Sequence, residues 1–175
     1  MKSENSSNAR WVNYFFRKGL EFLKFWNEYL AESNRDILFL LAQGFDPRMC
    51  SGITALSQAG GSGKRDCIII DFDEGANSPS RKHENLIEAN RKSLLEIFPN
   101  GKKTHKTVPM LSPEGKRTGS RSVVDAFNGF EEFLGYTDIV VDISAMPRAI
   151  FFPLVGSILF VADALAKQSS KKMFT

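Results

Sequence analysis

The sequence is poor in cysteine and histidine, and it lacks the spacings with which these residues bind metals. Its 175 residues contain two cysteines, Cys50 and Cys67, too few for a disulfide framework. We therefore expect a reducing, cytoplasmic setting. The two histidines, His83 and His105, have no paired ligand pattern. We expect both to be surface residues, and we expect no metal.

Signals for export or membrane insertion are also scarce. The N-terminus is polar and has no apolar run behind it, so we expect no signal peptide. Residues 149–165 form the one candidate for a membrane span, at about 17 residues, the lower limit for crossing a bilayer. Pro153 and Gly156 interrupt this segment, and Asp163 lies near its end. We expect a buried helix here and no membrane partner.

Two familiar nucleotide-binding motifs are missing as well. The Gly-x-Gly-x-x-Gly fingerprint is absent, which argues against NAD-dependent dehydrogenase chemistry. The segment Gly60-Gly-Ser-Gly-Lys64 resembles a phosphate loop only in part, because Gln58 and Arg65 stand where that loop needs Gly and Ser or Thr. We interpret the segment as a flexible turn and expect no bound cofactor.

The composition is that of one globular domain, with 42% hydrophobic and 25% charged residues. A net charge of +3 is too small to indicate a nucleic-acid partner by itself. The pattern predicts a disordered tail at 1–9, an amphipathic helix at 10–32, a Rossmann-like domain at 33–168 and a polar tail at 169–175. The aromatic residues of the 10–32 helix, among them Trp11, are expected to pack on the domain, and a dimer contact and a membrane surface are the alternatives.

Short apolar runs alternate with longer amphipathic segments along the chain. The runs predict strands at 37–42, 67–71, 107–111 and 138–143. Helices are predicted between and after them, at 49–58, 80–98, 122–134 and 149–166. This order predicts an α/β fold: a Rossmann-like parallel sheet of at least four strands, with helices on both faces. The continuous runs at 37–43, 67–71 and 138–143 predict adjacent, central strands, whereas Pro109 indicates an edge strand or a strand end.

Polar residues follow three of these strands and should meet at the carboxyl end of the sheet. They are Gly44, Asp46 and Arg48 after the first strand, Asp71 and Asp73 after the second, and Asp142, Ser144 and Arg148 after the last. Guanidinium groups bind phosphate and carboxylates accept ribose hydroxyls, so we expect a ligand site here, with Arg48, Asp71, Ser144 and Arg148 in one cleft. The alternative is that these residues only cap helices and fix loops, with Arg48 paired to Asp46 or Asp71.

Two further patterns have weaker implications. Asp71-Phe-Asp73 resembles the Asp-x-Asp motif of haloacid-dehalogenase-like phosphatases. That family usually has Thr or Val after the motif, where this chain has Glu74 and Gly75, and the second strand is the wrong strand for the motif. The basic segments 102–106 and 116–121 predict solvated loops, or a surface that attracts a polyanion if they flank the ligand site.

Asp142-Ile-Ser144 followed by Arg148 resembles the Asp-x-Thr/Ser-x-Gly-x-Lys/Arg pattern of CARF domains, the Rossmann-like sensors of CRISPR-linked immunity. Ala145 and Met146 stand where that family has glycines. The resemblance implies a nucleotide or cyclic oligonucleotide ligand, a role in antiviral defence, and a homodimer or a partner effector protein. It also implies that Ser144 and Arg148 contact the ligand and face the loop at 44–48.

Three functions remain open on the sequence. The first is the sensing of a phosphorylated nucleotide. The second is an enzyme acting on nucleotides, such as a nucleosidase-like hydrolase, for which a carboxylate would come from Asp46, Asp71, Asp73, Glu74 or Asp142. The third is an interaction module that acts through the aromatic helix at 10–32.

Overall fold

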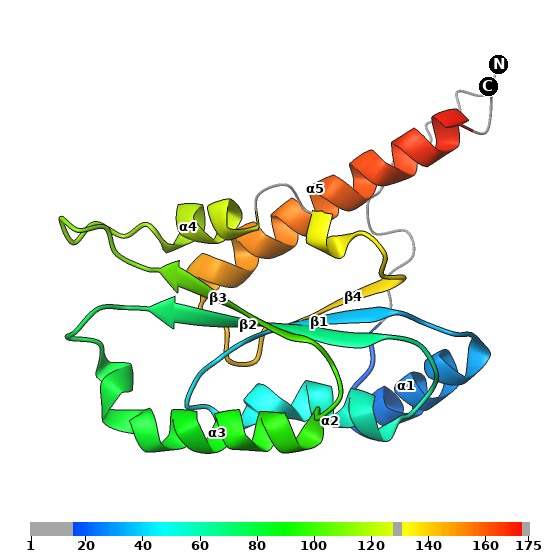
Figure 1. Ribbon diagram of the computed structural model, residues 1–175, viewed down its shortest axis with the longest axis horizontal. Helices are drawn as coiled ribbons and strands as arrows, with labels where there is room; N and C mark the ends of the chain where they lie inside the picture. The colour runs from blue at the N-terminus through cyan, green and yellow to red at the C-terminus, as the bar shows by residue number, and fades with distance from the viewer. Residues whose placement is uncertain (1–15, 128–130, 173–175) are drawn as a thin grey trace.

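The computed structural model describes residues 16–127 and 131–172. The predicted tail at 1–9, the first part of the predicted helix with Trp11 and Phe15, and the end of the predicted polar tail lie outside these ranges. Within them the chain forms an α/β fold around a four-stranded, all-parallel sheet with the strand order β3-β2-β1-β4 (Figure 1). The predicted fold class is therefore confirmed.

The strands are β1 (Ile37–Ala42), β2 (Arg65–Asp73), β3 (Lys103–Pro109) and β4 (Asp138–Asp142). Every residue of β1 is buried, because β1 lies between β2 and β4 and is covered on both faces. β4 was expected to be central, but it is an edge strand whose residues are all partly exposed. Its apolar run matches that of a central strand because its side chains still pack into both cores, Val140 on one face and Ile139 and Val141 on the other.

β3 begins four residues earlier than predicted, so that much of the basic segment at 102–106 forms an edge strand instead of a solvated loop. An edge strand tolerates this polar sequence because one side of it has no neighbouring strand. Val108 is the one buried residue of β3. The strand ends at Pro109, because proline has no N–H donor with which to continue the strand pairing.

Alternate side chains of the strands enter two separate cores. Ile37, Phe39 and Leu41 pack under α1 (Leu20–Glu32), α2 (Ser51–Gln58) and α3 (Glu84–Ile97). Leu38 and Leu40 pack on the other face, under α4 (Gly119–Ala126) and α5 (Arg148–Lys172). Figure 1 shows α1, α2 and α3 below the sheet and α4 and α5 above it. Short 3-10 turns stand at 47–50, 79–83 and 131–133.

The N-terminal helix is shorter than predicted, since α1 begins at Leu20 and residues 16–18 have no helical assignment. Gly19 precedes it with φ at 55°, in the left-handed region that interrupts a right-handed helix. Trp26 and Leu30 are buried against the domain, while Phe22 is half-buried. The aromatic face of α1 thus packs on the domain, which is one of the arrangements expected from the sequence.

α5 is the long helix predicted from 149–166, and it continues to Lys172. Its interior Pro153 removes the backbone hydrogen bond that would reach the carbonyl of Ala149. The hydroxyl of Ser120 donates to that carbonyl at 3.1 Å and so joins α4 to α5. Among the helices in the described ranges, none combines the length and hydropathy that crossing a membrane requires.

A buried carboxylate joins three segments at the amino end of the sheet. Asp66 in β2 accepts hydrogen bonds from the hydroxyl of Tyr136 at 2.6 Å and from the backbone N–H of Lys102 at 2.9 Å. Lys64 forms an ion pair with it at 3.0 Å. Burial raises the pKa of Asp66, but these three partners together lower it by more, so the net pKa lies below the usual range of aspartate. Asp66 thus ties the segments before β3 and β4 to β2.

We expect Phe127→Ala to lower the free energy of unfolding by about 3–5 kcal/mol, because Phe127 is fully buried and stacks on Phe133. Leu134→Ala is the control, since Leu134 is 55% exposed and its truncation should change stability by under about 0.5 kcal/mol. Urea denaturation measures both. Equal, small effects would contradict this account of the second core.

The lowered pKa of Asp66 predicts an acid-sensitive contribution to stability. Because the unfolded state takes up this proton more readily, the contribution is present above the ordinary aspartate pKa near 4 and is lost as the pH falls through the lower folded-state value. We expect Asp66→Asn to lower stability at pH 7 by about 1–3 kcal/mol. The variant should also lose less stability than the parent between pH 5 and pH 3. Urea denaturation across this range tests it, and parallel pH profiles would contradict it.

Candidate functional site

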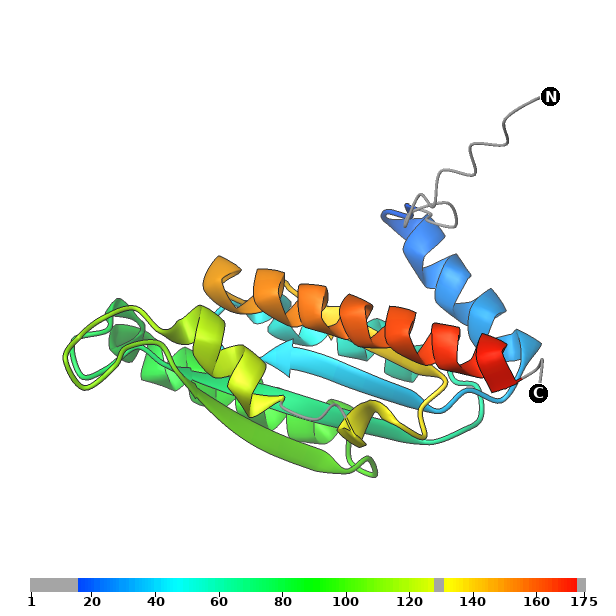
Figure 2. The same cartoon turned by 90° about the horizontal axis from the view of Figure 1, so that it is seen from above.

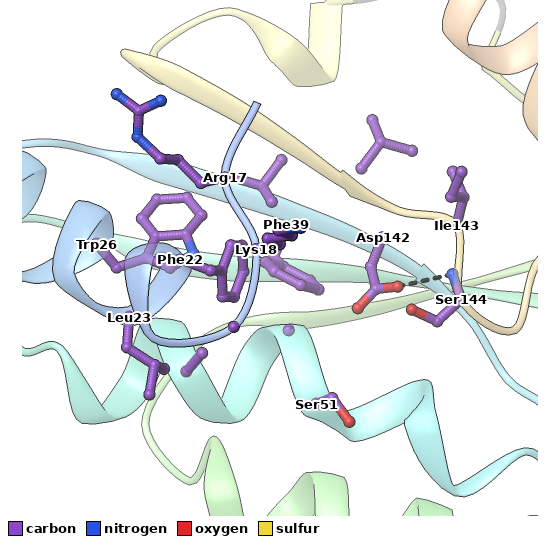
Figure 3. Close-up of a pocket in the computed structure, with 15 residues that line it drawn as sticks. Arg17, Lys18, Phe22, Leu23, Trp26, Phe39, Ser51, Asp142, Ile143 and Ser144 are labelled. Carbon is purple, nitrogen blue, oxygen red and sulfur yellow. Dashed lines mark hydrogen bonds between the residues drawn. The ribbon is translucent and has the colours of Figure 1, made fainter. Parts of the chain in front are cut away.

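A cleft of about 580 Å³ lies on the α1–α2 side of the sheet, beside the carboxyl end of β4 (Figure 3). β4 and the loop after it form one wall, α1 and the segment before it form another, and the first turns of α2 form the floor. This volume lies within the range of small-molecule sites. The lining combines a carboxylate, two cations, two hydroxyls and several aromatic rings.

Asp142 is the acidic group of the cleft. It is in register with Leu41 of β1, whose side chain faces α1, α2 and α3, so Asp142 faces the same side. Its carboxylate accepts a hydrogen bond from the backbone N–H of Ser144 at 2.8 Å, as Asp does in a turn that follows a strand. Figure 3 shows Asp142 and Ser144 together at one end of the cleft. Both residues were predicted to belong to the ligand site.

Gly52, in the first turn of α2, leaves the space that the Asp142 carboxylate occupies. A Cβ atom at Gly52 would lie 2.4 Å from Oδ2 of Asp142 and 3.2 Å from Cζ of Phe39. A glycine inside a helix costs about 0.5–1 kcal/mol relative to alanine, and no positive φ requires one here. The close approach of the carboxylate therefore explains the glycine. Asp142 also acts on Cys50, two residues before Gly52: burial first, and then this carboxylate, raise the pKa of the Cys50 thiol.

An aromatic wall faces Asp142 across the cleft. Phe22 and Trp26 of α1 form it with Phe39 of β1, and the rings of Phe22 and Trp26 meet edge to face, with centroids 6.1 Å apart. The indole Nε1 of Trp26 is buried and has no acceptor among the residues the structure describes. Leu23, 42% exposed, extends the apolar surface toward the solvent.

Two cations come from the short segment that leads into α1. Arg17 and Lys18 line the cleft, and Figure 3 shows this segment passing over it. Both side chains are exposed. The sequence predicts a helix at these residues and no ligand role for them, because only the turn at Gly19 brings the segment across the end of β4.

The structure gives the first loop a different arrangement from the one expected. Gly44 is buried and lies against the loop after β4, since its Cβ would lie 3.4 Å from that of Ala145. Arg48 is not in the lining of the cleft. Its side chain instead contacts its own loop, where Nε donates a hydrogen bond to Oδ1 of Asp46 at 3.0 Å. The hydrogen bonds from Arg48 lower the pKa of Asp46 to about 2. The alternative in which Arg48 pairs with Asp46 is the one that the structure supports.

The residues predicted after the second strand, and Arg148 after the last strand, are also outside the lining of the cleft. Asp71 pairs with Nδ1 of His105 at 2.8 Å, and Asp73 accepts from the N–H of Gly75 at 2.8 Å. β2 runs past the end of β1, which carries both carboxylates away from Asp142. Arg148 is the exposed first residue of α5, on the helix layer of the opposite face. Of the four residues expected to share one cleft, Ser144 lines this cleft, and Arg48, Asp71 and Arg148 do not.

A second cleft, of about 630 Å³, lies on the α4–α5 side between the loops that follow β2 and β3. Arg117, Gly119 and Ser120 line it, so part of the basic segment at 116–121 does flank the carboxyl end of the sheet. Across both described ranges, no group of three or more His, Cys, Asp or Glu side chains is placed to hold a metal ion.

We expect Gly52→Ala to lower the free energy of unfolding by about 1 kcal/mol, because crowding of the Asp142 carboxylate outweighs the better helix propensity of alanine. In an Asp142→Ala background the same substitution should instead stabilise the protein, by up to about 1 kcal/mol. Chemical denaturation of the four proteins gives the coupling energy. Additive effects would show that Gly52 and Asp142 do not constrain each other.

Comparison with family models, with curated proteins and with solved structures found no match to this chain.

Proposed function

We propose that the cleft beside Asp142 binds a phosphorylated nucleoside and that the protein senses this ligand, passing the signal to a partner or effector. One observation carries the proposal: a single cleft joins an aromatic wall to a carboxylate and two cations. These are the three kinds of surface that a base, a ribose and a phosphate require.

The place of the cleft in the fold supports the same conclusion. From β1 the chain moves outward to β2 and β3, and then returns across the sheet to form β4 on the other side of β1. The connections after β1 and β4 therefore leave toward opposite faces, to α2 and to α5. Ligands of open α/β sheets bind at the carboxyl strand ends where the strand order reverses in this way.

Each part of the ligand has a matching group in the cleft. Phe22 and Trp26 offer ring surface to a base, at roughly 1–3 kcal/mol for a stacked base. Asp142 can accept hydrogen bonds from ribose hydroxyls. Arg17 and Lys18 supply positive charge for a phosphate, and Arg17 can bind it with two parallel hydrogen bonds.

The acidic content of the cleft favours binding over hydrolysis. Asp142 is the single carboxylate among the described residues that line it. Glycosidic hydrolysis by general acid and base commonly uses two carboxyl groups that flank the bond. Asp46 and Asp71, which could have supplied the second, form hydrogen bonds elsewhere.

We also infer a cytoplasmic location, which the two free, buried cysteines support. The resemblance to CARF domains rests on Asp142, Ser144 and Arg148. It extends the proposal to cyclic oligonucleotides and to antiviral defence.

The proposal predicts that Asp142→Asn weakens nucleotide binding about 10- to 100-fold, because a charge-assisted hydrogen bond contributes roughly 1.5–3 kcal/mol. Isothermal titration calorimetry with AMP, ATP and a cyclic oligoadenylate measures this. Asp46→Asn is the matched control, since Asp46 lies at the same end of the sheet outside the cleft, and its variant should bind like the parent.

Chromatography of the nucleotides after incubation separates sensing from turnover. Intact ligand supports sensing, whereas released base or phosphate would favour the hydrolase alternative. A parent protein that binds none of these ligands at millimolar concentration, or an Asp142→Asn variant with unchanged affinity, would contradict the proposal.

A further inference from the structure

The second cleft, of about 630 Å³, has no role in the proposed binding of a nucleotide. It lies between the loops that follow β2 and β3 and the first residues of α4 and α5. Among the described residues, its lining has no member in common with that of the cleft beside Asp142. Figure 2 shows α4 beside the N-terminal end of α5, with both loops beyond the end of the sheet. The volume is that of a small-molecule site.

Backbone hydrogen bonds hold the walls of this cleft in place. The N–H of Met110 donates to the carbonyl of Asp73 at 2.8 Å, which ties the loop after β3 to the end of β2. The same loop then folds back on itself, because Leu111 and Arg117 form an antiparallel bridge. The N–H of Thr118 closes the fold by donating to the carbonyl of Met110 at 2.9 Å. The chain itself therefore positions Leu111 and Arg117 at the cleft, as in a site that is formed before its ligand binds.

The cleft carries one charge of each sign, and neither has an opposite charge beside it. The guanidinium of Arg117 pairs with no carboxylate in the described ranges. Glu74 lies on the loop after β2, and its Oε2 accepts a hydrogen bond from the hydroxyl of Ser78 at 2.5 Å. This neutral partner orients the carboxylate, and no cation of the described residues pairs with it. A ligand with one negative and one positive group would complement both.

The apolar part of the lining is aliphatic. Pro79, Met110, Leu111 and Ala149 contribute it, and no aromatic ring is among the described residues that line this cleft. A nucleobase would therefore have no ring to stack on. An aliphatic group would instead be favoured, because it would cover apolar surface such as that of Leu111, which is 40% exposed.

We propose that this second cleft binds a free amino acid with an aliphatic side chain, such as leucine. Arg117 binds the carboxylate of the amino acid, Glu74 binds its ammonium group, and Met110 and Leu111 cover its side chain. Gly119, at the start of α4, lies on the same wall, and its backbone N–H has no acceptor within the helix and so adds a donor for the carboxylate. This site does not depend on the proposed binding of a nucleotide in the first cleft.

The two charges decide against a purely anionic ligand. A phosphate monoester would gain from Arg117, but it would also bring negative charge close to Glu74, which is unfavourable. An amino acid carries both charges and no net charge, so it complements the cleft without this repulsion.

Amide NMR titration of the full chain with L-leucine tests the proposal and locates the ligand. The largest shifts should fall on Asn77, Arg117 and Ser120, which line the cleft from three segments. 4-Methylpentanoate lacks the ammonium group of leucine, and L-leucinamide lacks its carboxylate. Each should bind the parent at least about 10-fold more weakly than L-leucine, because each loses one charge-assisted contact. Glycine, without the side chain, should be weakened similarly.

Two variants assign these contacts to residues. Arg117→Gln should weaken the binding of L-leucine about 10- to 100-fold and leave that of L-leucinamide unchanged. Glu74→Gln should weaken L-leucine to a similar extent and leave 4-methylpentanoate unchanged. Lys116→Gln and Glu114→Gln are the matched controls, since both residues are exposed on the same loop outside the lining, and these variants should bind like the parent.

L-Leucine that causes no shifts at tens of millimolar, or shifts outside the second cleft, would overturn the proposal. So would equal weakening by Arg117→Gln and Lys116→Gln, or tighter binding of glucose 6-phosphate than of L-leucine. Asp142→Asn should bind L-leucine like the parent, because Asp142 lies outside this cleft. Loss of nucleotide binding and loss of leucine binding are therefore distinguishable.

Discussion

The complete burial of β1 is the constraint on which the rest of the structure depends. Its side chains alternate between two cores, and its backbone pairs with β2 on one side and with β4 on the other. A strand enclosed in this way tolerates no polar residue along its length, because a buried polar group without a partner costs several kcal/mol. The polar residues that could bind a ligand therefore lie in the loops beyond Ala42 and in the neighbouring strands.

The reversal of strand order around β1 then decides which polar residues meet. β4 ends level with Leu41 of β1, and the side chain of Asp142 points toward the start of α2, where Gly52 leaves room for it. The chain next crosses to the other face and continues as α5, whose outer side remains apolar. The short connection at 143–147 thus joins the proposed ligand cleft to the start of α5.

Much of this architecture follows from the sequence. Alternation of apolar runs with amphipathic segments gave the parallel α/β class and the position of β1, and it placed Asp142 and Ser144 correctly after a strand. The edge position of β4 did not follow, since its apolar run equals that of a central strand. The roles of Arg17 and Gly52 were also missed, because they depend on a turn and a close approach between segments distant in sequence. Arg48 and Asp71 found nearer partners, Asp46 and His105, which residue type alone does not reveal.

The central claim is that the cleft beside Asp142 is the ligand site. Amide NMR spectra recorded during titration with a nucleotide test it most directly, because they report contacts residue by residue without a substitution. The account predicts that the largest shifts fall on Lys18, Gly52 and Ser144, which come from three separate parts of the chain. Shifts confined to the second cleft, around Arg117 and Ser120, would contradict it. Spectra unchanged at saturating nucleotide would contradict it as well.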